Sequence, residues 1–206
     1  PHLCYKEDMR PDGNCRVCMV EIEGERVLQP SCVRTVTDGM IINTSTERVN
    51  HSQKLVLELL TSDVSEEVYT QDNELTTWAN KLQIQTHRFP SNIQDKCDTS
   101  HPAITVNLSA CIQCTRCVRA CREEQVNDVI GYAHRGIKSE IVFDINDPMG
   151  ESTCVGCGEC VQACPTGALM PSKEVGLTIP DKKVESVCPY CGVGCLLTYN
   201  VKDNKI

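Results

Sequence analysis

Cysteine is the residue type whose number and spacing point most directly to chemistry, since this 206-residue chain contains sixteen. The densest group lies in residues 154–165, which read Cys-Val-Gly-Cys-Gly-Glu-Cys-Val-Gln-Ala-Cys-Pro. The spacing Cys-x2-Cys-x2-Cys-x3-Cys-Pro is typical of thiolates that hold a [4Fe–4S] cluster, with three of them on one tight loop. Gly156 and Gly158 fit such a loop, because it needs positive φ angles and amide hydrogens directed at sulfur.

A second run with the same cysteine spacing occupies residues 111–121. Where two such runs occur, the fourth cysteine of each binds the cluster of the other, so the sequence predicts two [4Fe–4S] ligand sets. The first set is Cys111, Cys114, Cys117 and Cys164, and the second set is Cys154, Cys157, Cys160 and Cys121. The apolar neighbours expected to keep water from these clusters are Ile112, Val118, Val155 and Val161.

Four further cysteines follow a different pattern, Cys-x10-Cys-x2-Cys-x13-Cys, formed by Cys4, Cys15, Cys18 and Cys32. One close pair with two distant partners suits a [2Fe–2S] cluster, in which each iron takes two thiolates. The plant-type version has a shorter first gap of four residues, so the pattern here is a different one. A zinc site is the alternative at these four positions, because a single Cys-x2-Cys pair also occurs in zinc sites.

The last motif is Cys188-Pro-Tyr-Cys191-Gly-Val-Gly-Cys195, which supplies three thiolates for a third [4Fe–4S] cluster. No cysteine follows it, so either Cys97 returns as the fourth ligand or that ligand lies outside this sequence. We favour the second possibility. Cys97 stands alone between the motifs and is expected to be a free thiol.

Two other uses of the cysteines, zinc sites and a disulfide scaffold, explain the two four-cysteine runs less well. Zinc takes four ligands in one tetrahedron, usually from two separated Cys-x2-Cys pairs. The even cysteine count would suit disulfides, but grouping in metal-type spacings favours clusters and a reducing compartment, which predicts a cytoplasmic protein. Thiolates that serve as ligands leave no nucleophilic or acid–base catalysis within these residues.

Composition limits the remaining function classes. The formal net charge is −8, which argues against nucleic acid as a partner. No apolar run is long enough to span a membrane and no signal peptide is visible. Aromatic residues make up only 4% of the chain, so small modules organised by metal clusters are favoured over one large core.

The elements that must position these cysteines are short. Residues 18–28 predict a β-hairpin around a glycine turn. Thr44 and Glu47 form a predicted capping box for a helix, and a second helix is predicted from near Asp72. The apolar residues expected on these two helices are Val49, Leu55, Val56, Leu59 and Leu60, then Leu75, Trp78, Ala79 and Leu82. His51 is expected on the solvent side.

Farther along, residues 88–103 predict an extended linker and residues 103–108 a strand. Residues 131–133 and 140–145 predict a strand pair that covers the clusters, and another strand is expected after Pro165. The predicted fold class is α+β, with small iron–sulfur modules in series. The predicted modules are a partial [2Fe–2S] ferredoxin-like β-rich domain at 1–44, a helical connector at 45–100, a two-[4Fe–4S] bacterial-ferredoxin-like domain at 101–175, and the start of a [4Fe–4S] catalytic domain at 183–206.

The motifs together resemble a known arrangement. Residues 1–44 are similar to the [2Fe–2S] domain of the large iron–sulfur subunit of respiratory complex I and of related hydrogenases. The whole chain resembles the N-terminal iron–sulfur region of the α (catalytic) subunit of molybdenum- or tungsten-dependent, NAD-dependent formate dehydrogenases. The most specific parts are residues 109–134, 151–171 and 188–201. The chain departs from complex I in one cluster motif, His-x3-Cys-x2-Cys-x5-Cys, because no cysteine lies between Cys32 and Cys97.

This resemblance implies a function for the protein that contains the chain. Formate would be oxidised reversibly to CO2 at a Mo or W bis-pterin guanine dinucleotide cofactor in a catalytic domain beyond residue 206. Electrons would pass through the clusters to a separate NAD- and FMN-binding iron–sulfur subunit. The alternative is an electron-transfer subunit of a hydrogenase or complex-I-like NAD-linked oxidoreductase without its own catalytic site.

Overall fold

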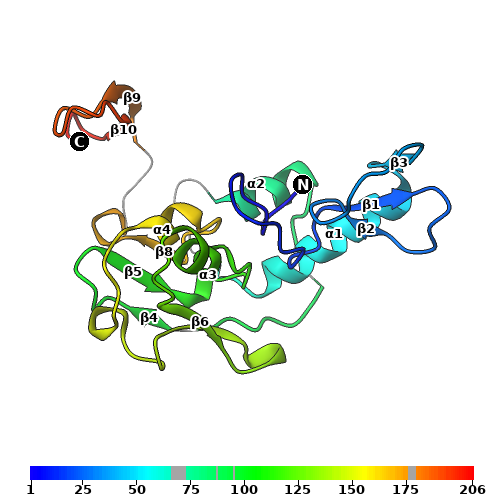
Figure 1. Ribbon diagram of the computed structural model, residues 1–206, viewed down its shortest axis with the longest axis horizontal. Coiled ribbons are helices and arrows are strands. Elements are labelled where there is room, and N and C mark those ends of the chain that lie inside the picture. The colour runs from blue at the N-terminus through cyan, green and yellow to red at the C-terminus, as the bar shows by residue number, and fades with distance from the viewer. Residues whose placement is uncertain (66–72, 87, 95, 176–179) are drawn as a thin grey trace. The chain divides into compact units, whose positions relative to one another are not determined.

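The computed structural model describes residues 1–65, 73–86, 88–94, 96–175 and 180–206. The chain divides into two compact units, Pro1–Val175 and Gly176–Ile206. The expected α+β class is confirmed, since short helices alternate with several small sheets in the order shown in Figure 1. The domain boundaries inside the first unit stay a prediction.

The first sheet of the larger unit has the strand order β2-β1-β3. Its strands are β1 (Met19–Ile22), β2 (Gln29–Pro30) and β3 (Ile42–Asn43), and both neighbours are antiparallel to β1. Val20 and Ile22 of β1 are buried, as the alternating pattern predicts. The turn has Gly24 at a φ of 82°, and the return strand begins just beyond the predicted hairpin.

Helix α1 (Glu47–Ser62) follows this sheet, but two details of the prediction were wrong. Its N-cap is Thr46 and not Thr44, because the extended Thr46 lets its hydroxyl accept from the Val49 amide at 3.3 Å. Its most buried face runs through Val49, Gln53 and Leu57, while Leu59 is 43% exposed. The Gln53 side chain donates to the Met19 carbonyl at 3.0 Å, which fixes the helix to β1.

Helix α2 (Glu74–Lys81) is capped by Asn73, whose side chain accepts from the Thr76 amide. The predicted start near Asp72 lies outside the described residues. Leu75 and Ala79 are buried as expected. The two helices share one apolar cluster with both the N-terminal segment and the first cysteine run, and its buried members are Leu3, Cys4, Val17, Leu57, Leu75, Ile112 and Cys114.

The rest of the larger unit surrounds a three-stranded antiparallel sheet of order β4-β5-β8, with strands β4 (Cys97–Asp98), β5 (Ile104–Asn107) and β8 (Leu169–Pro171). Helix α3 (Arg116–Arg119) continues into a π-helical turn at Ala120–Glu124, and α4 (Glu159–Ala163) lies beside α3 and β8 (Figure 1). Short 3₁₀ turns occupy Leu108–Ala110, Gly136–Lys138, Met149–Glu151 and Ser172–Glu174.

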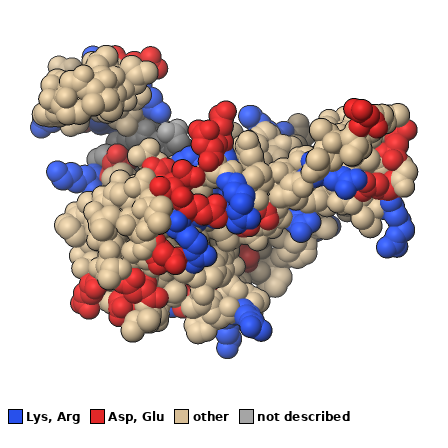
Figure 2. All heavy atoms as spheres, in the orientation of Figure 1, with Lys and Arg blue, Asp and Glu red and all other residues tan. Residues whose placement is uncertain are grey.

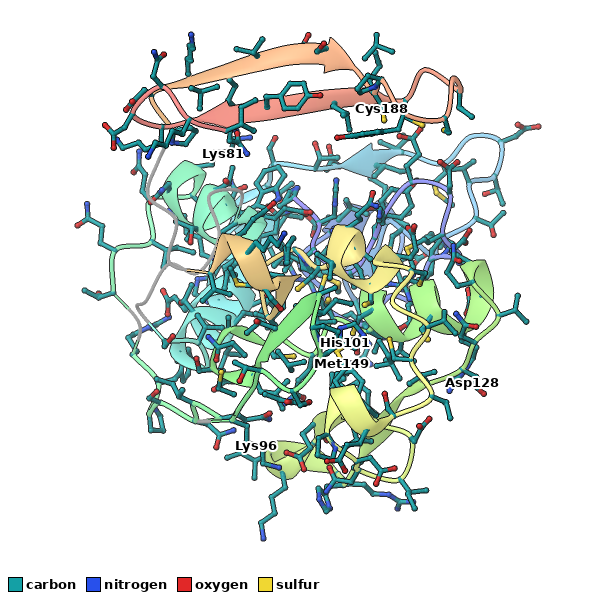
Figure 3. The ribbon with its side chains drawn as sticks, turned by 90° about the vertical axis from the view of Figure 1, so that its left-hand side faces the viewer. Lys81, Lys96, His101, Asp128, Met149 and Cys188 are labelled. Carbon is teal, nitrogen blue, oxygen red and sulfur yellow. The ribbon has the colours of Figure 1, made fainter. Side chains whose placement is uncertain are left out.

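The predicted covering strand pair is present as β6 (Ile130–Ala133) and β7 (Glu140–Phe143), which are antiparallel. Ile130, Ile141 and Phe143 are buried in the same apolar cluster as Cys117, Cys121 and Cys160. The loop after β7 returns to the sheet at Met149, which is 1% exposed and lies close to His101 (Figure 3). The insertion between the two cysteine runs therefore completes the apolar surroundings of both.

The smaller unit is a single antiparallel hairpin of β9 (Lys182–Val187) and β10 (Leu196–Val201). The register pairs Val187 with Leu196, so the intervening residues 188–195 form its end loop. Asp181 accepts from the Lys202 ammonium at 2.8 Å and from the Asp203 amide at 2.9 Å, which closes the open end.

The surface carries both signs of charge. Acidic and basic side chains are interspersed on the face drawn in Figure 2. Among the described residues, no helix is both long and apolar enough to cross a bilayer.

Candidate metal centres

The two cysteine runs fold into loops with the same backbone conformation. Gly156 and Gly158 have φ angles of 66° and 80°, as expected from the sequence. In the first run the equivalent positions are Gln113 and Thr115, with φ angles of 54° and 65°. Residues with a Cβ adopt this left-handed region only at a cost. Because Gln113 and Thr115 adopt it nevertheless, the loop conformation follows from the cysteine spacing and does not require glycine.

The amide directions in these loops also match. The Gln113 amide donates to the Cys111 sulfur at 3.4 Å, and the Gly156 amide donates to the Cys154 sulfur at the same distance. The Val129 amide donates to Cys121, also at 3.4 Å. Such N–H groups stabilise thiolates and tune the reduction potential of a bound cluster.

Each predicted [4Fe–4S] ligand set surrounds its own cavity. Cys111, Cys114, Cys117 and Cys164 line one cavity of about 390 Å³ including its opening, together with apolar residues such as Ile112 and Leu169. Cys121, Cys154, Cys157 and Cys160 line another of about 320 Å³, together with Val129 and Ile130. Each run thus places its fourth cysteine at the cavity of the other run. The donor set and space fit a cluster, and ligation itself stays a prediction.

The cavities are apolar enough to disfavour free thiolates. Burial raises the pKa of Cys111 to about 12 and the pKa of Cys160 to about 12. Burial, reinforced by neighbouring thiols, also raises the pKa of Cys117 well above its usual value. Without metal, these three thiols would therefore stay protonated at neutral pH, and iron must displace their protons when it binds.

The four N-terminal cysteines are also brought together. The Cys4 amide donates to the Cys15 sulfur at 3.3 Å, and the Cys15 amide donates to the Cys4 sulfur at 3.4 Å. The hydrogen bond from the Cys15 thiol lowers the pKa of Cys4 to about 5, whereas burial and then the nearby Cys18 raise the pKa of Cys32 to about 12. The pairs Cys4–Cys15 and Cys18–Cys32 suit the two irons of a [2Fe–2S] cluster.

The predicted [2Fe–2S] site lies directly against the loop of the first run. The Asn14 side chain donates to the Gln113 carbonyl at 2.7 Å, and the Thr115 hydroxyl donates to Asp12 at 2.7 Å. Ile112 is buried in the same cluster as Cys4. These two predicted sites are therefore in contact without a further cluster between them. The histidine-containing cluster motif that the chain lacks is not needed to connect them.

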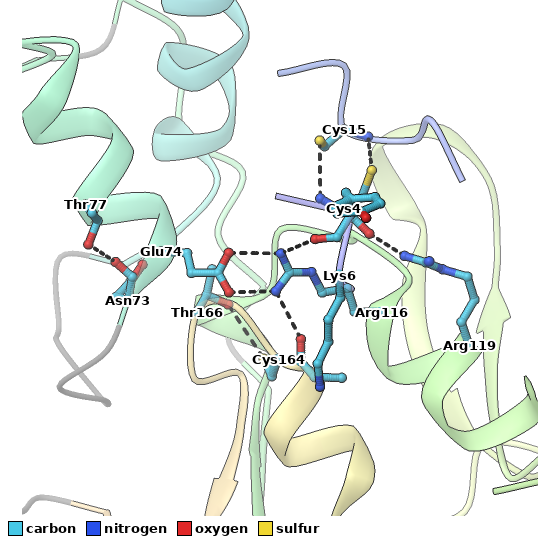
Figure 4. Close-up of polar contacts among 12 residues, drawn as sticks. Cys4, Lys6, Cys15, Asn73, Glu74, Thr77, Arg116, Arg119, Cys164 and Thr166 are labelled. Atoms are coloured by element: carbon cyan, nitrogen blue, oxygen red, sulfur yellow. Dashed lines mark hydrogen bonds and ion pairs between the residues drawn. The ribbon is translucent and has the colours of Figure 1, made fainter. Parts of the chain in front are cut away.

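Two arginines of α3 reinforce this junction and were not predicted from the sequence (Figure 4). Arg116 binds both carboxylate oxygens of Glu74, at 2.6 and 2.9 Å, and donates to the Tyr5 carbonyl at 2.6 Å. Arg119 donates to the carbonyls of Cys4 and Arg10. A signal was present in the sequence, because the second run has Glu159 and Gln162 where the first has these arginines.

The third predicted set lies in the end loop of the smaller unit. The Cys188 amide donates to the Cys195 carbonyl at 2.8 Å, and Gly192 and Gly194 have φ angles of 76° and 81°. Cys191 and Cys195 are exposed. The loop presents three thiols at one end of the hairpin, and its fourth ligand stays undetermined.

Two further predictions have structural outcomes. Val155 lines the second cavity as expected but is also 67% exposed, whereas Ile112 and Val118 are buried and Val161 is partly buried. Cys97 is an exposed free thiol on β4. In the described parts of the chain, no three His, Cys, Asp or Glu side chains converge closely enough to hold a single metal ion. The thiols surround cavities instead.

Three protein-family models match the chain in series. A 2Fe-2S iron-sulfur cluster binding domain matches residues 1–47, and a 4Fe-4S dicluster domain matches residues 110–168. The molybdopterin oxidoreductase Fe4S4 domain matches residues 181–206. The dicluster match contains both four-cysteine runs, and each of the other two matches contains one of the remaining cysteine groups.

Curated relatives carry names from three enzyme classes. An NADH-quinone oxidoreductase subunit of Rhizobium meliloti is 31% identical over 98% of this chain and 24% of its own length. The NADP-reducing hydrogenase subunit HndD of Solidesulfovibrio fructosivorans is 34% identical over 89% of this chain and 34% of its own length. A protein assigned as a formate dehydrogenase in Staphylococcus haemolyticus is 27% identical over the whole chain and 25% of its own length.

Among solved structures, an NAD⁺-reducing [NiFe]-hydrogenase in the H2-reduced state matches with a TM-score of 0.78 and 26% identity. That match covers 86% of this chain and 77% of the other. The chain spans about a quarter to a third of the length of these curated relatives. The chain is therefore an iron–sulfur region of the complex-I-like type, with a [2Fe–2S] domain, a two-[4Fe–4S] domain and a molybdopterin-oxidoreductase Fe4S4 segment in series.

Proposed function

We propose that this chain is the electron-transfer arm of a formate dehydrogenase, linking a Mo or W bis-pterin site to an NAD-reducing flavin partner. The single observation that carries the pterin site is the match of residues 181–206 to the Fe4S4 domain of molybdopterin oxidoreductases, and formate is the substrate in the name of the Staphylococcus haemolyticus relative. That domain type accompanies a pterin-bound metal, and its Cys188, Cys191 and Cys195 would hold the cluster beside it. The pterin site itself and formate binding would belong to residues outside this sequence.

Within the larger unit, the residues define an order of sites. When bound, the clusters supply one-electron carriers in series. The polypeptide sets the spacing by packing Leu3 and Cys4 against Ile112 and by the hydrogen bond from Asn14 to Gln113. Cys117 and Cys121 lie four residues apart on one helical segment and line different cavities, so the two [4Fe–4S] sites are held side by side.

The two predicted [4Fe–4S] sites differ in exposure. The first cavity is lined by the buried Cys114 and Cys117, whereas the second includes the exposed Cys157. The loop with Cys157 therefore provides an outward end at which a further carrier could approach. We propose that the flavin partner exchanges electrons at the [2Fe–2S] side, with the complex in the cytoplasm, where thiols stay reduced.

A hydrogenase or complex-I-like subunit without its own catalytic site is the second candidate. It is favoured by the match to the NAD⁺-reducing hydrogenase structure, which covers most of this chain. Both candidates use the [2Fe–2S] and the two [4Fe–4S] sites in the same way. They differ in the role of the segment after residue 180, which begins a catalytic domain in the first candidate and does not in the second.

The test is to purify the natural protein that contains this chain under anaerobic conditions and assay dye reduction with formate and with hydrogen. The proposal predicts formate-dependent reduction and molybdenum or tungsten stoichiometric with the chain. Hydrogen-dependent reduction by a preparation that contains neither metal would contradict the formate assignment and favour the second candidate. Adding NAD to the complete complex tests the flavin partner separately.

A further inference from the structure

Arg119 is a buried cation whose polar contacts, within the described parts of the chain, are all with backbone carbonyls. The residue is 4% exposed. Its Nη1 donates to the Arg10 carbonyl at 2.6 Å, its Nη2 donates to the Cys4 carbonyl, and its Nε has no hydrogen-bond partner. Among the described residues, no carboxylate lies within ion-pair distance of this guanidinium. Figure 4 shows the side chain reaching from α3 to Cys4.

The neighbouring arginines of the same helical segment are compensated. Arg116 is equally buried but forms a two-pronged ion pair with Glu74. Arg122 pairs with Asp128 at 2.6 Å, and its side chain is 54% exposed. At the position equivalent to Arg119, the second run carries the neutral Gln162. All three residues carry a positive charge, but among the described residues only Arg116 and Arg122 have a carboxylate partner and Arg119 has none.

An uncompensated buried charge is costly in a folded protein unless an opposite charge lies nearby. Arg119 lies between two predicted cluster ligands, Cys117 and Cys121, and contacts the backbone of a third, Cys4. A cluster held by four thiolates is net negative and gains one more negative charge when it is reduced. The nearby positive charge therefore stabilises the reduced form more than the oxidised form, and raises the reduction potential.

We propose that Arg119 is the counter-charge of the [2Fe–2S] site at Cys4, Cys15, Cys18 and Cys32, and that it raises the reduction potential of that site. This inference rests on the proposed function only in that these four cysteines hold a [2Fe–2S] cluster. Arg119 does not bind the cluster; its positive charge acts on the cluster through the electrostatic field. The first run, which lies against the [2Fe–2S] site, carries Arg119, whereas the second run carries Gln162 at the equivalent position. We therefore expect the effect of this charge at the [2Fe–2S] site.

The test is a redox titration with dithionite, monitored by the electron paramagnetic resonance signal of the reduced [2Fe–2S] cluster. The variants are Arg119→Gln, which installs the residue of the second run, and Arg119→Lys, which keeps the charge but not the fork. At the wild-type midpoint potential, Arg119→Gln is expected to lower the ratio of reduced to oxidised cluster about tenfold, which is about 59 mV for a one-electron couple. Arg119→Lys is expected to retain the wild-type midpoint.

Arg122→Gln is the matched control, because it removes the same charge from the same segment at an exposed position. Its shift is expected to be small and to vanish at high salt, whereas the Arg119→Gln shift persists. Unchanged g-values would show that the cluster geometry is intact. Equal shifts in Arg119→Gln and Arg122→Gln, or a lowered midpoint in Arg119→Lys, would overturn the proposal.

The outcomes also separate this inference from the proposed function. If Arg119→Gln loses the cluster, the midpoint potential of the [2Fe–2S] cluster in Arg119→Lys tests the proposal instead. A wild-type midpoint potential in that variant would support the counter-charge role. Loss of the cluster from both variants, measured by iron content, would assign Arg119 to holding the segment and overturn the proposal. A wild-type protein with no [2Fe–2S] signal would instead contradict the assignment of the four cysteines.

Discussion

At the scale of single residues, Cys121 and Cys164 are the cysteines that tie the two runs together. Each follows the other three cysteines of its run in sequence but lines the cavity of the other run. Each cavity therefore depends on residues more than 30 positions apart, and neither ligand set is complete within one loop. This exchange is what makes the two sites one domain.

Cys121→Ser should therefore impair the second site, although Cys121 belongs to the first run. We expect the chain to lose up to about four irons, while the [4Fe–4S] site at Cys111, Cys114, Cys117 and Cys164 is retained. Iron analysis together with the spectrum of the reduced protein measures this. Cys97→Ser is the control and should leave the iron content unchanged, since Cys97 is exposed on β4. Loss of the first site in place of the second would contradict the exchanged ligand sets.

Asp98 is a second residue whose role can be tested, through pH. Burial raises the pKa of its carboxyl, but hydrogen bonds from the Ser100 hydroxyl and from the Met149 and Ser100 amides outweigh this and lower the pKa below its usual value. The amide of Met149 donates to Asp98 at 2.6 Å and that of Ser100 at 2.8 Å. A lowered folded-state pKa means that the ionised form stabilises the fold above the unfolded-state pKa and loses this contribution as the pH falls through the folded-state value.

Asp98→Asn should consequently be less stable than wild type at neutral pH, by no more than about 0.5 kcal/mol because solvent screens this partly exposed carboxyl. The difference should stay constant between pH 8 and pH 5 and shrink only below about pH 4, the region of the unperturbed carboxyl. Denaturant unfolding of both proteins at several pH values between 8 and 5 measures it. A difference that closes within that interval would show that the Asp98 carboxyl is not held ionised by these bonds.

At the scale of elements, the chain after β7 returns to the sheet through a very close backbone contact. A Cβ placed on Gly150 would lie 2.5 Å from the Ser100 carbonyl oxygen and 3.0 Å from the His101 amide nitrogen. The Gly150 amide also donates to the Ser100 hydroxyl at 2.8 Å. Only glycine allows this approach, because the atoms in the way belong to the backbone of the loop that joins β4 to β5.

Gly150→Ala is therefore expected to destabilise the protein by about 1–3 kcal/mol through a forced backbone shift. Gly131→Ala is the matched control, because a Cβ there would have its nearest neighbour at 3.9 Å, an ordinary contact. The midpoint of chemical denaturation, measured for both variants, compares the two positions. Equal destabilisation would mean that the close approach at Gly150 is not what matters.

The elements also show which parts of the fold follow from the sequence. The spacing of the cysteines requires loops around a cluster, and the alternation in residues 19–22 requires a half-buried strand, so both could be predicted. The cap at Thr46 and the buried face through Gln53 and Leu57 could not. The cap depends on the local backbone conformation of Thr46, and the buried face depends on tertiary contacts such as that of Gln53 with the Met19 carbonyl, which periodicity does not contain.

The arginine contacts escaped prediction for the same kind of reason. Arg116 and Arg119 look like ordinary charged positions in a cysteine motif. Apart from the distant Glu74 carboxylate that pairs with Arg116, the partners named above are backbone carbonyls of residues 4, 5 and 10. Backbone acceptors leave no signature in a sequence. The one visible signal was the departure from the second run, where the equivalent residues are Glu159 and Gln162.

At the scale of the whole molecule, the larger unit brings the predicted [2Fe–2S] site into contact with the first cysteine run. The motif with a histidine ligand is missing, but the predicted [2Fe–2S] site lies against the first run through Ile112, Gln113 and Thr115. The chain thus forms a series of adjacent sites in its larger unit and a separate thiol loop in its smaller unit. Several adjacent one-electron sites are useful when a two-electron reaction is distant from its acceptor.

The measurement that tests this account most directly is the content of iron and acid-labile sulfide in the anaerobically purified chain. Three complete ligand sets predict about ten irons with equal sulfide, counted as one [2Fe–2S] and two [4Fe–4S] clusters. Supplying the fourth ligand of the set at Cys188, Cys191 and Cys195 should raise the count to about fourteen. Zinc in place of iron, without labile sulfide, would contradict the assignment of these cysteines as iron–sulfur ligands.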